Sequence, residues 1–167
     1  QYILGDSTPS LLIYDASFAE AATRLIDLCQ IPNHLEVDAN DAGSSYRQAL
    51  QSVTGNYQPI ECTHDDVAMI MYTSGTTGAP KGVVLAHSNV LASMAGLNDS
   101  ADLTNQDVYL AYLPLAHIME MAAECLMMAL GAAIGYGSPQ TLTDTGLKLA
   151  PGSRGDAPTL QTTFIMV

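Results

Sequence analysis

Short apolar runs rich in β-branched and aromatic residues alternate with amphipathic stretches along this chain. Residues 11–29 pass from such a run into a stretch with helical periodicity, and residues 34–55 repeat that order. Each pattern predicts a strand and then a helix. Ser17 and Glu20 predict a capping box before the first helix, and Gly55 closes the second. Because strands that alternate with helices favour parallel pairing, we expect an α/β fold with a layered, largely parallel sheet and flanking helices.

The rest of the chain continues this alternation. "VAMIM" (67–71) is a continuous apolar run, which is typical of a central strand covered on both faces. The later pattern first predicts a strand at 83–85 and a helix from 87 capped by Ser88 or Asn89. It then predicts a strand halted by Pro114, a helix at 117–130 stopped by Gly131, and a short strand and turn within 131–139. The polar segment at 141–161 predicts a helical turn followed by an exposed loop. We expect one layered unit whose loops meet at a common edge, where such sheets usually bind ligands.

The loop "YTSGTTGAPKG" (72–82) follows the apolar run directly. Its glycines let backbone N–H groups approach phosphate oxygens, its hydroxyl groups donate further hydrogen bonds, and its lysine neutralises charge. Lys81 is the only Lys or Arg between Arg47 and Lys148. A surface turn without a ligand is the simpler alternative, but it does not explain a lone cation beside a central strand. The loop therefore predicts a polyphosphate site.

This loop differs from the common nucleotide motifs. P-loop NTPases need G-x-x-x-x-G-K-[ST], whereas here Pro80 precedes Lys81 and Gly82 follows it, and the dinucleotide pattern G-x-G-x-x-G is absent. Residues 72–82 instead resemble, position by position, the phosphate-binding signature of the adenylate-forming superfamily. That superfamily contains acyl-CoA synthetases, luciferases and peptide-synthetase adenylation domains.

The resemblance extends beyond the loop. "LAYLPLAHIME" (110–120) is similar to the superfamily's next motif, an LPL-x-H segment that lines the acyl pocket. "GYGSPQTLTD" (135–144) and "GSRGDAPTLQTTF" (152–164) resemble the long-chain fatty acid CoA ligases in particular. The resemblance implies that residues 1–167 are a fragment of the large N-terminal AMP-binding (adenylation) domain of such an enzyme, with the C-terminal domain outside the chain.

The resemblance also implies a reaction and roles for residues. A fatty acid and ATP would give an acyl adenylate and pyrophosphate, and CoA would then replace AMP to form a thioester. Lys81 would stabilise the leaving pyrophosphate, Thr73 would help to hold Mg²⁺, and His117 would position substrate at the pocket wall. The residues expected to bind the nucleotide are Thr73, Ser74, Gly75, Thr76, Thr77, Gly78 and Lys81. The CoA site and the remaining motifs would lie largely outside this chain, so we expect the chain alone to be inactive.

Other interpretations of these residues stay open. His117 is either a pocket residue or a buried core histidine. With Glu120 and Glu124 it shares one helical face, which makes a rival site for a divalent metal, although hydrogen bonds at the sheet edge suit one or both carboxylates better. "HDD" (64–66) is explained more simply as a turn and cap than as a metal cluster. The alternative functions are a ligase for another carboxylic acid and a non-catalytic nucleotide-binding protein.

Charge and cysteine content narrow the partners and the compartment. Five Lys and Arg against seventeen Asp and Glu give a net charge of -12, which disfavours nucleic acid and leaves small molecules as partners. Cys29, Cys62 and Cys125 fit neither a disulfide framework nor a CxxC pattern, so we expect buried thiols in an intracellular protein. Residues 125–137 are too short an apolar stretch to cross a bilayer. The resemblance to a ligase with an insoluble product implies that the parent protein is cytoplasmic or peripheral on an organelle membrane.

Overall fold

The computed structural model describes residues 1–167 except 39, 41–42, 75–77 and 167. The chain divides into two compact units. The first contains Gln1–Glu61 and Thr73–Gly82, and the second contains Cys62–Tyr72 and Val83–Val167. Each unit is described below by itself.

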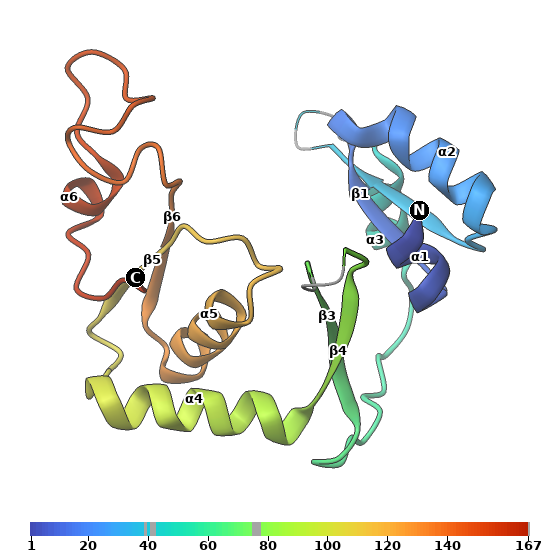
Figure 1. Ribbon diagram of the computed structural model, residues 1–167, viewed down its shortest axis with the longest axis horizontal. Coiled ribbons are helices and arrows are strands. Elements are labelled where there is room, and N and C mark those ends of the chain that lie inside the picture. Colours follow the sequence, from blue (N-terminus) through green and yellow to red (C-terminus); the bar gives the residue numbers. More distant parts are fainter. Residues whose placement is uncertain (39, 41–42, 75–77, 167) are drawn as a thin grey trace. The chain divides into compact units, whose positions relative to one another are not determined.

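The first unit is built on one parallel strand pair. β1 (Leu12–Asp15) pairs with β2 (His34–Val37), with Leu12 opposite His34 and Asp15 opposite Val37. The 3-10 helix η1 (Ala16–Phe18) and the helix α2 (Ala19–Cys29) connect the two strands, α3 (Ser45–Ser52) follows β2, and α1 (Tyr2–Ser7) precedes β1. Figure 1 shows α2 and α3 beside this strand pair. The expected strand–helix order and parallel pairing are confirmed, whereas α1 was not predicted.

The start of α2 differs from the predicted capping box. Asp15 caps the short helix η1, because its Oδ1 accepts a hydrogen bond from the Ser17 N–H at 2.9 Å. The helix α2 begins only at Ala19, and no side chain caps it. Ser17 and Glu20 therefore form no capping box. The 3-10 turn moves the start of the α-helix two residues past the serine, which then serves as a donor instead of a cap.

Two longer strands flank the predicted loop. β3 (Val67–Thr73) and β4 (Lys81–Ala86) form a two-stranded sheet. The expected burial of "VAMIM" on both faces is wrong in this structure, since Val67 is 58% and Ile70 is 46% exposed. "HDD" forms a turn as predicted, and Asp66 Oδ2 accepts from the Thr63 N–H at 2.6 Å.

The second unit contains the best-packed core. β5 (Val108–Ala111) pairs in parallel with β6 (Ala133–Tyr136), and α4 (His87–Ala101), α5 (Ile118–Leu130) and α6 (Asp156–Leu160) complete the unit. In Figure 1, α5 lies beside both strands and next to α4. The core side chains with no exposure are Tyr109, Leu110, Ala123 and Met127. Phe164 continues the sheet, with a parallel bridge to Tyr109 and a ring centroid 5.6 Å from that of Tyr109.

Several boundaries in the second unit shift from their predicted positions. β5 ends at Ala111, before Pro114. The helix α4 begins at His87, so Asn89 lies inside it and its Oδ1 reaches back to accept from the Ala86 N–H at 2.9 Å. The helix α5 ends at Gly131 as expected, with φ 71° at that glycine. In the polar segment the predicted order is wrong, because the helical turn is α6 and it follows the loop instead of preceding it.

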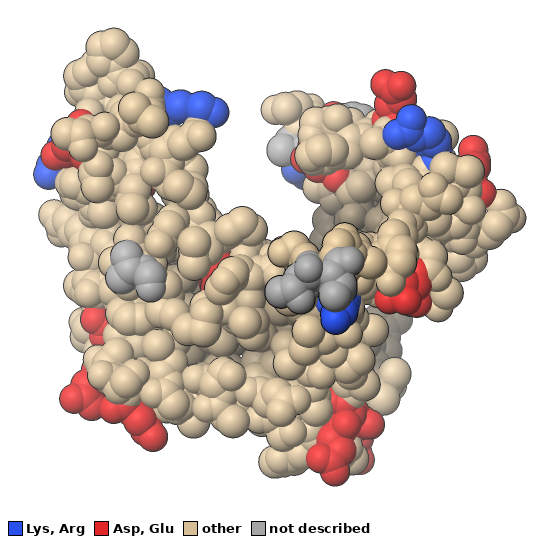
Figure 2. Space-filling view, viewed as in Figure 1, with Lys and Arg blue, Asp and Glu red and all other residues tan. Residues whose placement is uncertain are grey.

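Many large apolar side chains of the described residues are exposed at the surface. Figure 2 shows a face on which charged side chains occupy a small part. Cys62 is exposed, and Cys29 and Cys125 are half-buried free thiols, so the expectation of buried thiols is wrong. Within the described ranges, no helix combines the length and the hydropathy that a bilayer span needs.

Candidate functional site

The two ends of the predicted phosphate loop stand on regular strands. Thr73 is the last residue of β3, Ser74 follows it, and Lys81 is the first residue of β4; all three are exposed. Gly78 has φ 95°, a left-handed conformation that favours glycine. The predicted residues Gly75, Thr76 and Thr77 lie outside the described residues. The strands thus present two hydroxyl groups and one ammonium group at the ends of a single loop.

These groups suit a magnesium polyphosphate. Thr73 offers an exposed hydroxyl oxygen, and Mg²⁺ prefers oxygen ligands and is usually bound through few protein groups together with substrate phosphates. The part of the chain that the structure describes contains no group of three or more His, Cys, Asp or Glu that could hold a metal. The exposed hydroxyl oxygen of Thr73 is the type of protein ligand that such an ion would accept beside phosphate oxygens.

His117 belongs to the second unit and occupies the N-cap of α5. Its φ of -96° and ψ of 125° are extended, and its Nδ1 accepts a hydrogen bond from the Met119 N–H at 3.3 Å. Because Nδ1 is an acceptor, the ring proton of the neutral imidazole lies on Nε2. The side chain is exposed, so the alternative of a buried core histidine is wrong. His117 can therefore present an N–H donor to a ligand.

The two glutamates near His117 bind different partners. Glu120 has no exposure, and its Oε2 accepts from the Leu113 N–H at 3.2 Å. Glu124 is 6% exposed, and its Oε2 accepts from the Tyr136 hydroxyl at 3.0 Å. The structure therefore contradicts the rival metal site formed with His117. The expected hydrogen bonds at the sheet edge are confirmed.

Burial shifts the acidity of the groups around Glu120. Burial raises the pKa of the Glu120 carboxyl, while the Tyr109 phenol and the Leu113 N–H oppose that shift. Burial also raises the pKa of Tyr109, and the neighbouring Glu120 raises it further. Neither Tyr109 Oη nor Glu120 Oε1 has a hydrogen-bond partner among the described residues. Sequence analysis named Glu120 but missed Tyr109 and Leu113 as its neighbours.

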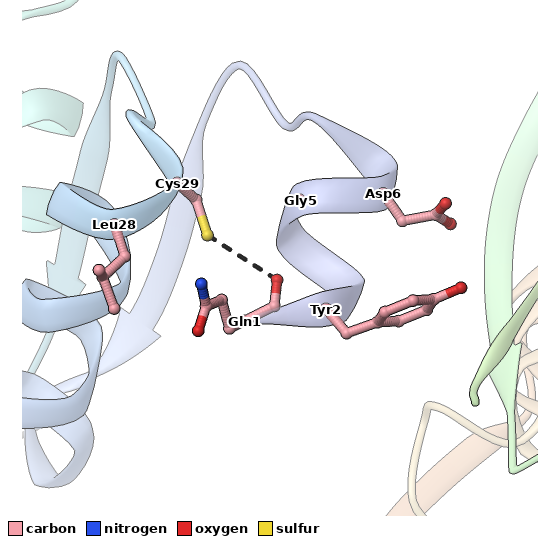
Figure 3. A pocket seen from close by; sticks show the side chains of 6 residues that line it. All are labelled: Gln1, Tyr2, Gly5, Asp6, Leu28 and Cys29. Carbon is pink, nitrogen blue, oxygen red and sulfur yellow. Dashed lines mark hydrogen bonds between the residues drawn. The ribbon is translucent and has the colours of Figure 1, made fainter. Parts of the chain in front are cut away.

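A separate hollow lies in the first unit. It has a volume of about 700 Å³ and is lined by Gln1, Tyr2, Gly5, Asp6, Leu28 and Cys29. Figure 3 shows that it lies between α1 and the end of α2, where the Cys29 thiol donates to the Gln1 carbonyl oxygen at 3.8 Å. None of the predicted site residues lines it.

Comparison with known proteins places the chain in a family. The family model described as AMP-binding enzyme matches residues 1–151. Long chain acyl-CoA synthetase 8 of Arabidopsis thaliana is 36% identical over 181 residues, which cover 98% of this chain and 25% of that protein.

Two solved structures support the same placement. The inhibitor-bound N-terminal domain of FACL13 from Mycobacterium tuberculosis has 28% identity and a TM-score of 0.70 over 81% of this chain and 34% of that chain. MatB from Rhodopseudomonas palustris, solved with bound ATP, has 25% identity and a TM-score of 0.69 over 81% of this chain and 27% of that chain.

The chain spans about a quarter of the length of the Arabidopsis relative. The α/β architecture with parallel strand pairs agrees with the fold of the solved N-terminal domain. The family match covers most of the chain, including the loop between β3 and β4 and the segment that carries His117. The chain therefore belongs to the family of AMP-binding enzymes.

Proposed function

We propose that the protein containing this chain is an ATP-dependent long-chain fatty acid CoA ligase. The observation that carries the proposal is the family match over a loop that stands between two strands and ends at an exposed lysine. In the first step the fatty acid carboxylate attacks the α-phosphorus of ATP, and the bond to pyrophosphate breaks to give an acyl adenylate. In the second step the CoA thiol attacks the acyl carbon and AMP leaves.

The loop contributes to the first step. The Lys81 ammonium stabilises the negative charge that develops on the departing pyrophosphate. The Ser74 hydroxyl and the Gly78 backbone N–H donate hydrogen bonds to phosphate oxygens. A bound Mg²⁺ would neutralise phosphate charge beside the Thr73 hydroxyl. The predicted phosphate contacts of Gly75, Thr76 and Thr77 belong to the same proposal.

His117 positions the acyl adenylate instead of acting as a general base. Its Nδ1 is already engaged by the Met119 N–H, so the ring offers an Nε2–H donor at the start of α5. A donor in this position orients a carboxylate or phosphate oxygen without accepting a proton. CoA is the second substrate, and its site lies largely outside this chain.

The preference for long acyl chains rests on the Arabidopsis relative and on the segments at 135–144 and 152–164. Those two segments bind each other. Asp156 Oδ2 accepts from the Ser138 N–H at 3.2 Å and from the Thr141 hydroxyl, and Asp144 Oδ1 accepts from the Gly155 N–H at 2.8 Å. Hydrogen bonds in both directions along the pair give this part of the chain a defined shape. We place the protein inside the cell, in the cytoplasm or peripherally on an organelle membrane.

ATP–pyrophosphate exchange tests this function. The full-length protein is assayed with carboxylic acids from acetate to oleate, and we expect exchange that is strongest with long acyl chains. Exchange that is strongest with short or aromatic acids would favour a ligase for another acid. A folded protein that binds ATP and catalyses no exchange with any acid would favour a non-catalytic nucleotide-binding protein.

A further inference from the structure

Glu120 connects three parts of the second unit. It lies in the first turn of α5, its Oε2 accepts from the Leu113 N–H in the connection between β5 and α5, and its carboxyl group is near enough to the buried Tyr109 hydroxyl in β5 for each group to shift the pKa of the other. Its side chain has no exposure to solvent. A single carboxyl group thus interacts with the strand and the connection that precede His117 and belongs to the helix that follows it.

Stability alone does not explain this buried carboxyl group. A buried polar atom without a hydrogen bond destabilises a fold, and both Glu120 Oε1 and Tyr109 Oη lack a partner among the described residues. The helix α5 is otherwise almost entirely apolar, and apolar side chains of similar volume often replace buried carboxylates without loss of stability. The position therefore calls for a role other than stabilisation.

The hydrogen bonds of the connection lead to His117. Glu120 holds the Leu113 N–H, and the next residue, Pro114, accepts from the His117 N–H at 2.8 Å through its carbonyl oxygen. His117 in turn lies one helical turn before Glu120, so both face the same side of α5. The Glu120 carboxyl group therefore holds the first residue of the segment 113–117, and the hydrogen bond from the His117 N–H to the Pro114 carbonyl oxygen holds the last.

We propose that Glu120 is a positioning residue, which sets the His117 imidazole at the start of α5 by fixing the Leu113 backbone. The proposal rests on the proposed function, because it deepens the role given there to His117. Glu120 does not touch substrate. A neutral carboxyl suffices for this task, since its carbonyl oxygen still accepts the Leu113 N–H.

Four variants of the full-length protein separate this role from a structural one. Glu120→Ala and Glu120→Leu remove the acceptor, and the leucine keeps the site filled. Glu120→Gln retains an acceptor oxygen, and Glu124→Gln is the matched control one turn further along α5. The measurements are kcat and KM in ATP–pyrophosphate exchange, the thermal midpoint, and the hydrogen exchange of the Leu113 amide.

We expect Glu120→Ala and Glu120→Leu to lower kcat for exchange by about tenfold to a hundredfold with little change in KM for ATP. We expect Glu120→Gln to retain most of the wild-type kcat and Glu124→Gln to behave like wild type. Hydrogen exchange of the Leu113 amide should accelerate only in the alanine and leucine variants.

Two results would overturn the proposal. One is exchange kinetics in Glu120→Leu that match wild type, and the other is a Leu113 amide whose protection does not depend on residue 120. If the wild-type protein itself catalyses no exchange, the proposed function fails, and the Leu113 amide then decides alone whether Glu120 fixes this segment.

Discussion

Replacing Lys81 with alanine tests the proposed chemistry of the loop. Lys81 is exposed at the first residue of β4, so its removal opens no cavity and should change the free energy of unfolding by less than about 0.5 kcal/mol. An ammonium roughly 4 Å from a phosphate oxygen interacts by about 4 kcal/mol at an effective dielectric constant of about 20. Loss of one such stabilising group lowers turnover by roughly tenfold to a thousandfold, or about 1.4 to 4 kcal/mol. We expect kcat for exchange to fall by a factor in that range.

The control for this variant is Lys148→Ala. Lys148 is the next lysine along the chain and is also exposed, but it lies in the polar segment after β6. Both variants change the net charge of the protein equally, so a general electrostatic effect would appear in both. We expect only Lys81→Ala to lose exchange, without a change in thermal midpoint. Undiminished exchange in Lys81→Ala would refute the argument that this cation stabilises the leaving pyrophosphate.

Three further predictions concern the second unit. Met127→Ala should lower the free energy of unfolding, measured by denaturant titration, by about 2 to 5 kcal/mol, because the Met127 side chain has no exposure. The control Met128→Ala should lower it by less than about 0.5 kcal/mol, because Met128 is 63% exposed. Equal losses in the two variants would contradict the assigned core. His117→Ala should raise KM or lower kcat for the fatty acid, while ATP binding measured by calorimetry stays unchanged. Weakened ATP binding in this variant would argue against an acyl-pocket role. Burial raises the pKa of Glu120 above its ordinary value of 4.5. At a pH between the unfolded and the folded pKa, the folded protein therefore keeps a proton on Glu120 that the unfolded chain loses. The stability of wild type relative to Glu120→Gln should therefore fall as pH rises from about 4.5 through the folded pKa, and a pH-independent difference would contradict this.

Local signals in the sequence predicted most helices and strands. The end of α5 at Gly131 was predicted correctly because a left-handed C-cap strongly favours glycine, whatever lies around it. The start of α2 was not, because Asp15 and Ser17 both suit a cap and only the 3-10 turn decides between them. The helix α1 was missed, since "YILGDS" contains a glycine and has no capping side chain at Gln1.

Burial was harder to predict than secondary structure. The continuous apolar run "VAMIM" indicates a strand, but it does not say which neighbours cover its faces, and Val67 and Ile70 are exposed here. The methionines of α5 show the same limit, because Met127 is fully buried while its neighbour Met128 is exposed. Helical periodicity assigns a face to each residue. It cannot assign the packing partners on that face, which come from distant parts of the chain.

The glutamates of α5 show why the candidate site could be predicted only in part. By periodicity Glu120 and Glu124 are equivalent, being one turn apart on the face that begins with His117. The fold separates them, because the connection after β5 reaches Glu120 and the end of β6 reaches Glu124. Glu120 therefore ties the first turn of α5 to the connection after β5, whereas Glu124 ties a later turn of the helix to the end of β6. The placement of His117 is thus a tertiary property. The motif names the residue and the Met119 N–H holds its ring, but the hydrogen bond from Leu113 to Glu120 ties the segment that precedes it to α5.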